Sequence, residues 1–323
     1  MIRTASYKSK QFLTLAIKLF IVIGCCYFIY NKLYNNQQLD FEAFYSNSTK
    51  NNLFSLKNVS FLFFFSIVNW SLEIKKWQLL ANQISNISFS EALKQSLASL
   101  TASLITPNRI GEYGAKAIYF TKSKRKQVLL LNLIGNLYQL TTTIIFGIIG
   151  LTFFYLNYSL PRQLSNSLFY IGLVLLLIIF IWLILKKTVS FKGYSFQSII
   201  QFTKDISTSS KLNIGILSIV RYIIFTHQFY FLLFIFDVDI SYSEALFSIF
   251  TMYILASIIP MLSLFDVVIK SSVAIWVFGF FNANELDILT IVMIIWTYNF
   301  VLPSLFGSYY VLTFKPPKII QTE

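Results

Sequence analysis

The feature that most constrains this chain is a set of long apolar runs that hold almost no charges. The clearest run, Leu168–Leu185, has eighteen residues without a charge. A helix that crosses the roughly 30 Å hydrocarbon core of a bilayer needs about 20 mostly apolar residues. Six runs meet this requirement: Phe12–Tyr34, Val59–Leu80, Val128–Leu156, Leu168–Leu185, Leu212–Phe236 and Ile288–Phe314. The sequence therefore predicts an all-α polytopic membrane protein with six transmembrane helices.

Composition supports a membrane protein and argues against other classes. Charged residues make up 12% of the chain and hydrophobic residues 56%, whereas a soluble domain is about one quarter charged. The net charge is +13, but the basic residues lie in short clusters between apolar runs, which is typical of membrane proteins. We therefore expect no nucleic-acid partner. The adjacent Cys25 and Cys26 and the single His227 indicate no disulfide framework, no metal site and no cofactor.

Two further apolar regions are interrupted. Ala92–Phe120 is broken at Thr106-Pro107, and Ala245–Phe281 is broken at Pro260. The 13 residues before the first break span about 20 Å as a helix, which is too short to cross. We predict that each region is a re-entrant hairpin that returns to the side it entered. Ala245–Phe265 is also long enough to cross alone, with the following run returning at once.

The charges between the runs predict the orientation. No small-residue cleavage site follows the basic N-terminus, so Phe12–Tyr34 is expected to be a retained span. With the N-terminus inside, the cytoplasmic stretches hold Lys75, Lys76, Lys94, Lys122, Lys124, Arg125, Lys126, Lys186, Lys187, Lys192, Lys204, Lys211, Lys315 and Lys318. The outer stretches hold Asp40, Glu42, Lys50, Lys57, Arg162, Asp237, Asp239, Glu285 and Asp287. This distribution follows the positive-inside rule and predicts a multi-pass protein of the bacterial cytoplasmic (inner) membrane with both termini cytoplasmic.

The sequence contains an internal duplication. Ile87–Leu93 recurs as Ile240–Leu246 with six of seven residues matching, at an offset of 153. With at most one residue of slippage, the same offset aligns Pro107 with Pro260, Glu112 with Asp266 and Lys116 with Lys270. Each copy has an odd number of crossings, so the second copy must be inverted in the membrane. Inverted repeats with broken helices are typical of transporters. We predict one domain, 1–323, built from repeats 12–156 and 166–314.

The first break has features of an anion site. Thr106 is expected to cap a helix that has Pro107 at its first position, and the amide groups at such a helix start attract anions. Arg109 would add a bidentate donor for phosphate in the first turn. We therefore predict that Thr106, Pro107 and Arg109, with Pro260 at the second break, contribute to a substrate site.

The two aligned acid–lysine pairs are the main candidates inside the membrane. Glu112 lies four residues before Lys116, and Asp266 lies four residues before Lys270, the favourable order for an ion pair on one helix face. Three interpretations stay open. The pairs neutralise themselves and fix the hairpin apices, they line a polar cavity for an anionic headgroup, or they lie in surface loops. Intramembrane charges are costly, which favours a functional role.

Other polar residues in the spans are secondary candidates. Glu73 lies in the last turns of Val59–Leu80 and makes this the weakest span. Arg221 either lines the cavity or extends to the inner surface, and His227 either carries protons or packs between helices. Three further side chains, Asn132, Asn136 and Gln139, are expected to join helices by hydrogen bonds.

Three segments resemble one known family. Asn69–Trp77, Thr106–Glu112 and the Pro260…Asp266…Lys270 stretch are similar to the transmembrane region of lysylphosphatidylglycerol synthases, a flippase-like domain that also occurs as standalone chains. The resemblance covers nearly the whole chain. It implies translocation of a lipid or lipid-linked substrate. The family usually has Gly where this chain has Asn108, and its second element is richer in Gly than Leu262–Phe265. The synthase domain is absent, so aminoacyl transfer is not implied.

These observations favour a lipid flippase-like protein that moves or binds an anionic lipid or lipid-linked precursor. We see no catalytic triad, phosphate loop or soluble catalytic domain, so we do not expect an enzyme. Two alternatives remain open: an ion- or proton-coupled permease for a small polar solute, and a non-transporting accessory subunit of an envelope-lipid enzyme. The expected partners are a membrane lipid with an anionic headgroup and either a second copy of the chain or an envelope-lipid enzyme.

Overall fold

The computed structural model describes residues 23, 41–104, 106, 110–158, 190–191, 194–258 and 266–315. This part of the chain is helical apart from two short strands, β1 (Ser190–Phe191) and β2 (Tyr194–Ser195), which pair antiparallel. The all-α prediction therefore holds except for this two-residue ladder. The predicted spans Phe12–Tyr34 and Leu168–Leu185 lie outside the described residues, apart from Ile23.

Four long helices match the other predicted spans within a few residues. They are α3 (Leu56–Ala81), α6 (Arg125–Asn157), α9 (Thr208–Ile235) and a continuous helix, Glu285–Leu312. The last three are long and apolar enough to cross a membrane. Side chains cap the starts of several of these helices, as where Ser55 accepts a hydrogen bond from the amide of Asn58.

The continuous helix Glu285–Leu312 contains a local irregularity. It consists of α12 (Glu285–Trp296), the π-helical segment η3 (Thr297–Val301) and α13 (Leu302–Leu312). A π-helical turn inside an α-helix is rare and is frequent at functional sites. Two further helices lie outside the predicted spans, α2 (Phe41–Lys50) before α3 and α8 (Phe196–Asp205) before α9.

The two broken regions each form a pair of helices. The first consists of α4 (Phe89–Ser103) and α5 (Ile110–Ala117), and the second of α10 (Tyr242–Ile258) and α11 (Asp266–Phe278), which ends in the 3₁₀ turn η2 (Gly279–Phe281). The first predicted interruption is therefore confirmed, whereas the second, at Pro260, lies outside the described residues. α10 is described as far as Ile258 and has 17 residues, or about 25 Å of helix; residues 259–265 lie outside the described part of the chain.

The duplicated segments Ile87–Leu93 and Ile240–Leu246 contain the starts of α4 and α10. The amide of Ser88 donates to the carboxylate of Glu91 at 2.7 Å, and the hydroxyl of Ser88 accepts from the amide of Glu91 at 3.2 Å. Ser241 and Glu244 form the same reciprocal arrangement. This is a capping box, which satisfies two amide groups of the first turn. The repeated sequence therefore encodes the same helix start twice.

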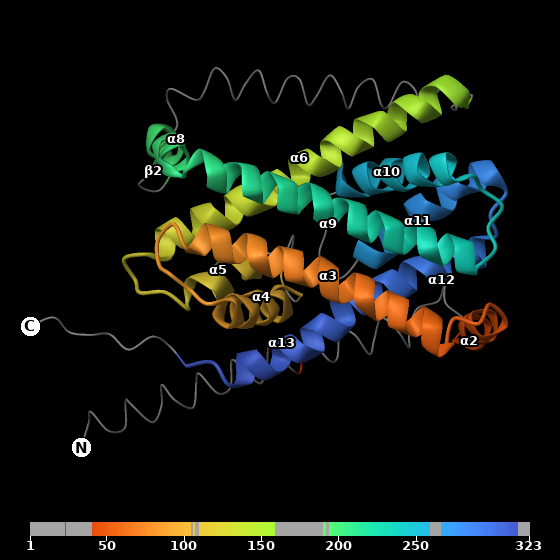
Figure 1. Cartoon of the computed structure of the whole chain (residues 1–323), viewed down its shortest axis with the longest axis horizontal. Helices are drawn as coiled ribbons and strands as arrows, with labels where there is room; N and C mark the ends of the chain where they lie inside the picture. Colours follow the sequence, from red (N-terminus) through yellow and green to blue (C-terminus); the bar gives the residue numbers. More distant parts are fainter. Residues whose placement is uncertain are drawn as a thin grey trace, which may run out of the picture.

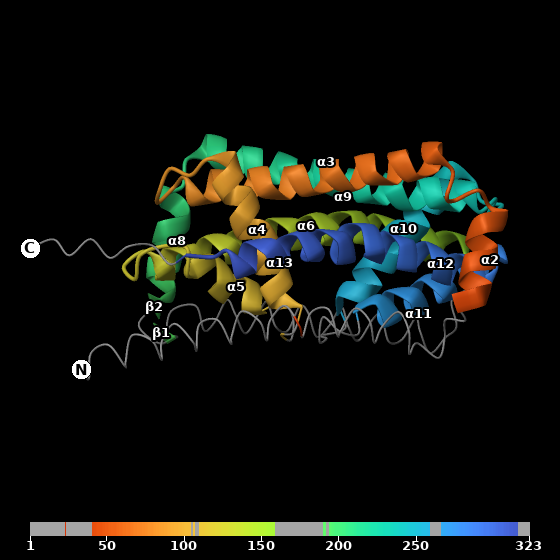
Figure 2. The ribbon, with the colours of Figure 1, turned by 90° about the horizontal axis from the view of Figure 1, so that it is seen from below.

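The helices form layers with reciprocal contacts. α3 and α9 lie side by side in one layer, α6 and α12–α13 in the next, and α5 and α11 lie farther from α3 and α9 (Figure 2). α4 packs along α13, and α10 packs along α6. The broken helix of each half therefore lies against the last long helix of the other half.

The two helix pairs begin and end at opposite ends of the bundle (Figure 1). The pair α4–α5 begins and ends at what we name the basic end, which carries Lys122, Lys124, Arg125, Lys126, Lys211 and Lys315. The pair α10–α11 begins and ends at the acidic end, which carries Asp237, Asp239, Glu285 and Asp287. The charged loops are therefore separated along the bundle in the way the sequence predicts.

Glycines allow the reciprocal packing. A methyl group placed on Gly150 of α6 would lie 2.6 Å from the carbonyl oxygen of Phe247 in α10. A methyl group on Gly307 of α13 would collide with the backbone at Leu97 in α4. Small residues of this kind let helix backbones approach closely. The buried apolar side chains form two clusters, one around α9–α12 and one around α3–α6.

Candidate functional site

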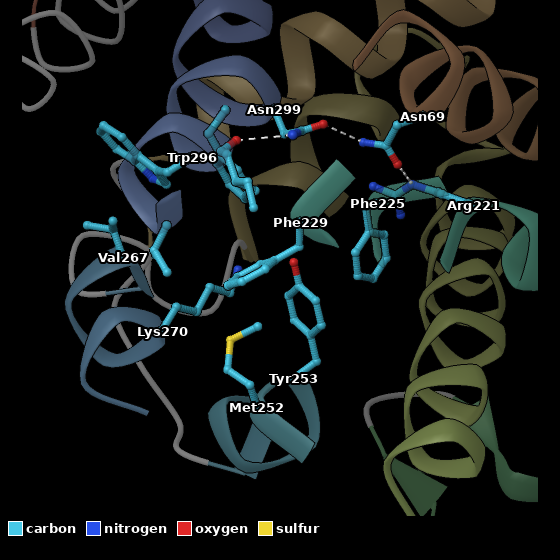
Figure 3. A pocket seen from close by; sticks show the side chains of 13 residues that line it. Asn69, Arg221, Phe225, Phe229, Met252, Tyr253, Val267, Lys270, Trp296 and Asn299 are labelled. Atoms are coloured by element: carbon cyan, nitrogen blue, oxygen red, sulfur yellow. Dashed lines mark hydrogen bonds between the residues drawn. The ribbon is translucent and has the colours of Figure 1, made fainter. Parts of the chain in front are cut away.

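An internal cavity of about 200 Å³ lies between α3, α9, α10, α11 and the α12–η3 region. Most of its lining is aromatic or aliphatic, including Phe225, Phe229 and Trp296 (Figure 3). The polar side chains that line it are Asn69, Arg221, Tyr253, Lys270 and Asn299. Among the described lining residues, both charged side chains are basic. An apolar pocket with a few convergent polar groups is the usual form of a ligand site.

Arg221 reaches the cavity from α9. Its Nη1 atom lies 2.9 Å from Oε2 of Glu73 in α3, and its Nε atom donates to Oδ1 of Asn69 at 3.0 Å. Nη1 also donates to Oε1 of Gln139 in α6 at 3.3 Å. Of the two alternatives left by the sequence, lining the cavity is the one observed, because an acceptor set on α3 and α6 holds the guanidinium inside the bundle.

Glu73 pairs with a second cation. Its Oε2 atom lies 2.7 Å from Nζ of Lys76, whose side chain is only 2% exposed. Lys76, which the sequence assigns to a cytoplasmic stretch, is therefore enclosed within the bundle. α3 continues to Ala81, and positions three residues apart face the same side of a helix, so Lys76 turns inward with Glu73. Lys76 and Arg221 share one carboxylate oxygen, which leaves one positive charge in excess within this triad of described residues.

Lys270 enters the cavity from α11, on the side opposite Arg221 (Figure 3). Its Nζ atom lies 2.7 Å from Oδ2 of Asp266, which confirms the predicted pair. The two side chains are 29% and 32% exposed. Lys270 also lies 5.6 Å from the centre of the Phe300 ring, within the range of a cation–π contact.

The matching pair in the first half has a different environment. Nζ of Lys116 lies 2.8 Å from Oε1 of Glu112 and donates to Oδ1 of Asn132 at 2.7 Å. It also lies 4.3 Å from the ring of Trp77. The Lys116 side chain is 2% exposed, and among the described residues that line the cavity neither Lys116 nor Glu112 appears. Of the two aligned pairs, this cavity therefore receives only Lys270, and a shared route lined by both pairs stays a prediction.

A chain of amide side chains crosses the bundle beside the cavity. Asn69 Nδ2 donates to Asn299 Oδ1 at 2.8 Å, and Asn299 Nδ2 donates to Gln228 Oε1 at 2.7 Å. Trp70 Nε1 donates to the carbonyl of Asn299 at 3.1 Å. These bonds attach η3 to α3 and α9. Gln228 and Asn299 were not predicted as site residues, although amide side chains inside apolar runs are a usable signal.

The remaining predicted residues have other positions. Thr106 Oγ1 accepts a hydrogen bond from the amide of Gly111 at 2.9 Å, so its hydroxyl caps α5, which is described from Ile110. Pro107, Arg109 and Pro260 lie outside the described residues. His227 is half-buried, and its Nε2 atom lies 2.9 Å from the hydroxyl of Tyr242. It is not among the residues that line the cavity.

The polar residues of α6 join helices as expected. Asn132 binds Lys116 of α5, and Asn136 Nδ2 donates to the hydroxyl of Tyr113 in α5 at 3.0 Å. Gln139 binds Arg221 of α9. In the described part of the chain, no group of three His, Cys, Asp or Glu side chains could hold a metal ion.

Comparisons of the chain with protein-family models, with curated proteins and with solved structures gave no match. The site is therefore interpreted from its own geometry. Two basic side chains face a mostly apolar cavity from opposite sides, and the carboxylates that pair with them do not line it. This arrangement can bind a small anionic group whose attached chain is apolar.

Proposed function

We propose that the protein is a multi-pass membrane protein that binds an anionic lipid, or a lipid-linked precursor, and moves its headgroup between leaflets. The observation that carries the proposal is the cavity between Arg221 and Lys270. Its volume of about 200 Å³ is below the 300–1,000 Å³ that holds a drug-sized ligand. It suits a headgroup whose acyl chains remain in the bilayer. An anion there also neutralises the positive charge in excess on the Lys76–Glu73–Arg221 triad.

The proposed topology has six spans and two re-entrant hairpins in two inverted repeats. Three observations support it: the repeated element order, the reciprocal packing of α4 on α13 and α10 on α6, and the opposite ends at which the helix pairs begin. The positive-inside rule then places the basic end and both termini in the cytoplasm of a bacterium. On this proposal the chain is a relative of the lysylphosphatidylglycerol synthase transmembrane region; this resemblance stays a prediction.

The test is a translocation assay in vesicles that contain the purified full-length protein. We expect movement of fluorescent phosphatidylglycerol across the bilayer, and we expect Arg221→Gln and Lys270→Gln to reduce its rate at least about tenfold, since each removes a charge that the anion contacts. Lys122→Gln is the control, because Lys122 is exposed at the basic end. Equal rates in all four proteins would remove the proposal. Uptake of free glycerol phosphate without lipid movement would instead support a small-solute permease.

A further inference from the structure

Glu73 lies at the centre of the ionic contacts, and its two partners are held differently. Lys76 comes from the same helix, is three residues away and is almost completely buried. Arg221 comes from α9, is 20% exposed and lines the cavity. Both cations contact the same oxygen, Oε2. Lys76 is therefore the fixed partner of Glu73, and Arg221 is the partner that can be exchanged.

The donors of Arg221 show where an exchange can occur. A guanidinium has five N–H donors and binds carboxylate or phosphate in a bidentate manner. Nε binds Asn69, and Nη1 binds Glu73 and Gln139. Within the described part of the chain, Nη2 makes no hydrogen bond. An anion in the cavity therefore meets a guanidinium with unused donors, already oriented by two neutral amides.

The charges of Lys76, Glu73 and Arg221 balance only when an anion binds, and an exchange then gives each charge its own partner. With Arg221 and Lys76 both on Glu73, two cations share one carboxylate. An unbalanced buried charge is costly. If an anion forms an ion pair with Arg221, Glu73 remains paired with Lys76. Each of the two cations then has one anionic partner. Asp266 keeps Lys270 throughout, because the two are neighbours on α11.

Resting on the proposed function, we infer that Glu73 is a displaceable counter-ion for Arg221 and so a positioning residue for the substrate anion. It holds the guanidinium in the absence of substrate and releases it to a phosphate or carboxylate oxygen of the headgroup. Competition from Glu73 keeps the anion from binding so tightly that it cannot leave on the other side. Glu73 thereby limits affinity and favours release.

The experiment measures binding of a short-chain fluorescent phosphatidylglycerol to the full-length protein in neutral detergent. We expect Glu73→Gln to bind the probe about tenfold more tightly than the wild type, because a close competing charge is removed. It should also move the lipid more slowly in vesicles. Glu112→Gln is the matched control: it also removes a carboxylate from a buried lysine, but Glu112 has no contact with Arg221 among those described.

A double-variant cycle separates this role from a structural one. If Glu73 acts through Arg221, Glu73→Gln should not tighten binding when Arg221→Gln is also present. The same gain in both backgrounds, or no gain in the wild-type background, overturns the inference while leaving the proposed function in place. Failure of the wild type to bind the probe overturns both. Competition by free glycerol phosphate as strong as by the lipid identifies the free anion as the ligand.

Glu73→Asp decides the matter if Glu73→Gln does not fold. Asp keeps the charge for Lys76 but is one methylene shorter, so it holds Arg221 less firmly. We expect this variant to bind the probe more tightly than the wild type, with melting close to that of the wild type. Affinity equal to or below that of the wild type contradicts the inference.

Discussion

Nδ2 of Asn69 donates a hydrogen bond to Oδ1 of Asn299 at 2.8 Å, and so connects two residues that are 230 positions apart in the chain. Oδ1 of the same Asn69 accepts from Nε of Arg221. Both polar ends of one amide are therefore used, and their orientation is fixed. This single side chain attaches the π-helical segment η3 to α3 and directs the guanidinium that faces the cavity.

Replacing Asn69 with Leu should destabilise the protein by about 2 kcal/mol, because Arg221 and Asn299 each lose a buried partner. The measurement is thermal unfolding in neutral detergent. Asn157→Leu is the control, since Asn157 is exposed at the end of α6 and bonds only to the carbonyl of Phe153 among the described residues. Equal melting temperatures of the two variants would contradict the role assigned to Asn69.

The two aligned lysines should respond differently to removal of their charge. Lys116→Met leaves the carboxylate of Glu112, only 9% exposed, beside a neutral side chain. We expect a loss of about 3–5 kcal/mol, as for other broken buried pairs. Lys270→Met should cost less than half of this, because Asp266 is about one third exposed and is solvated. Thermal unfolding of both variants checks the order, and the combination Glu112→Gln with Lys116→Met should recover part of the loss. A reversed order would contradict the difference in burial.

A methyl group at Gly150 should loosen the contact between α6 and α10. Gly150→Ala places a carbon 2.6 Å from the carbonyl oxygen of Phe247, so the helices have to separate, at a cost of about 1–3 kcal/mol. Gly114→Ala is the matched control, because a methyl group there has no neighbour within 4 Å. The measurement is the melting temperature of each variant relative to the wild type. A Gly150→Ala protein that melts at the wild-type temperature would show that the close approach of α6 and α10 is not needed.

Labelling of two equivalent serines should test the inverted arrangement. Ser90 and Ser243 occupy matching places at the starts of α4 and α10, at opposite ends of the bundle. In a protein with Cys25 and Cys26 replaced by Ser, we expect a membrane-impermeant thiol reagent to label Ser243→Cys in intact cells. Ser90→Cys should be labelled only after the membrane is opened. Labelling of both from one side would end the inverted-repeat proposal and the transport proposal with it.

The capping box of α4 should contribute to the pH dependence of stability. Hydrogen bonds from the backbone and hydroxyl of Ser88 hold the pKa of Glu91 below its ordinary value. A carboxylate with a lowered pKa in the folded state stabilises the protein above its unfolded pKa, about 4.3, and loses this effect as the pH falls through the folded pKa. The difference in melting temperature between wild type and Glu91→Gln should therefore shrink below about pH 4. A difference that does not change with pH would contradict this.

The sequence was sufficient to predict the positions of the helices but not the burial of their charged side chains. Prolines and acid–x–x–x–lysine spacing placed the breaks and both ion pairs, because these depend on local chemistry. The same spacing gave no warning that Lys116 is enclosed while Lys270 faces a cavity, since that difference depends on how each helix pair packs against the opposite half. Glu73 was predicted only as a secondary candidate for a similar reason, although it pairs with both Lys76 and Arg221. Charged residues near the end of a predicted span usually indicate the membrane boundary. Only the contact with Arg221, which is distant in the sequence, shows that Glu73 is inside the bundle.

The reciprocal packing has a consequence for synthesis. α10 packs along α6 but belongs to the second half of the chain. The face of α6 that contacts α10 therefore lacks this partner when the ribosome has completed only the first half. That face of α6 gains its partner helix only when residues 242–258 have been synthesised. The glycines on this face of α6 form a contact surface whose partner is synthesised later. The bundle is complete only when each half packs against the broken helix of the other half.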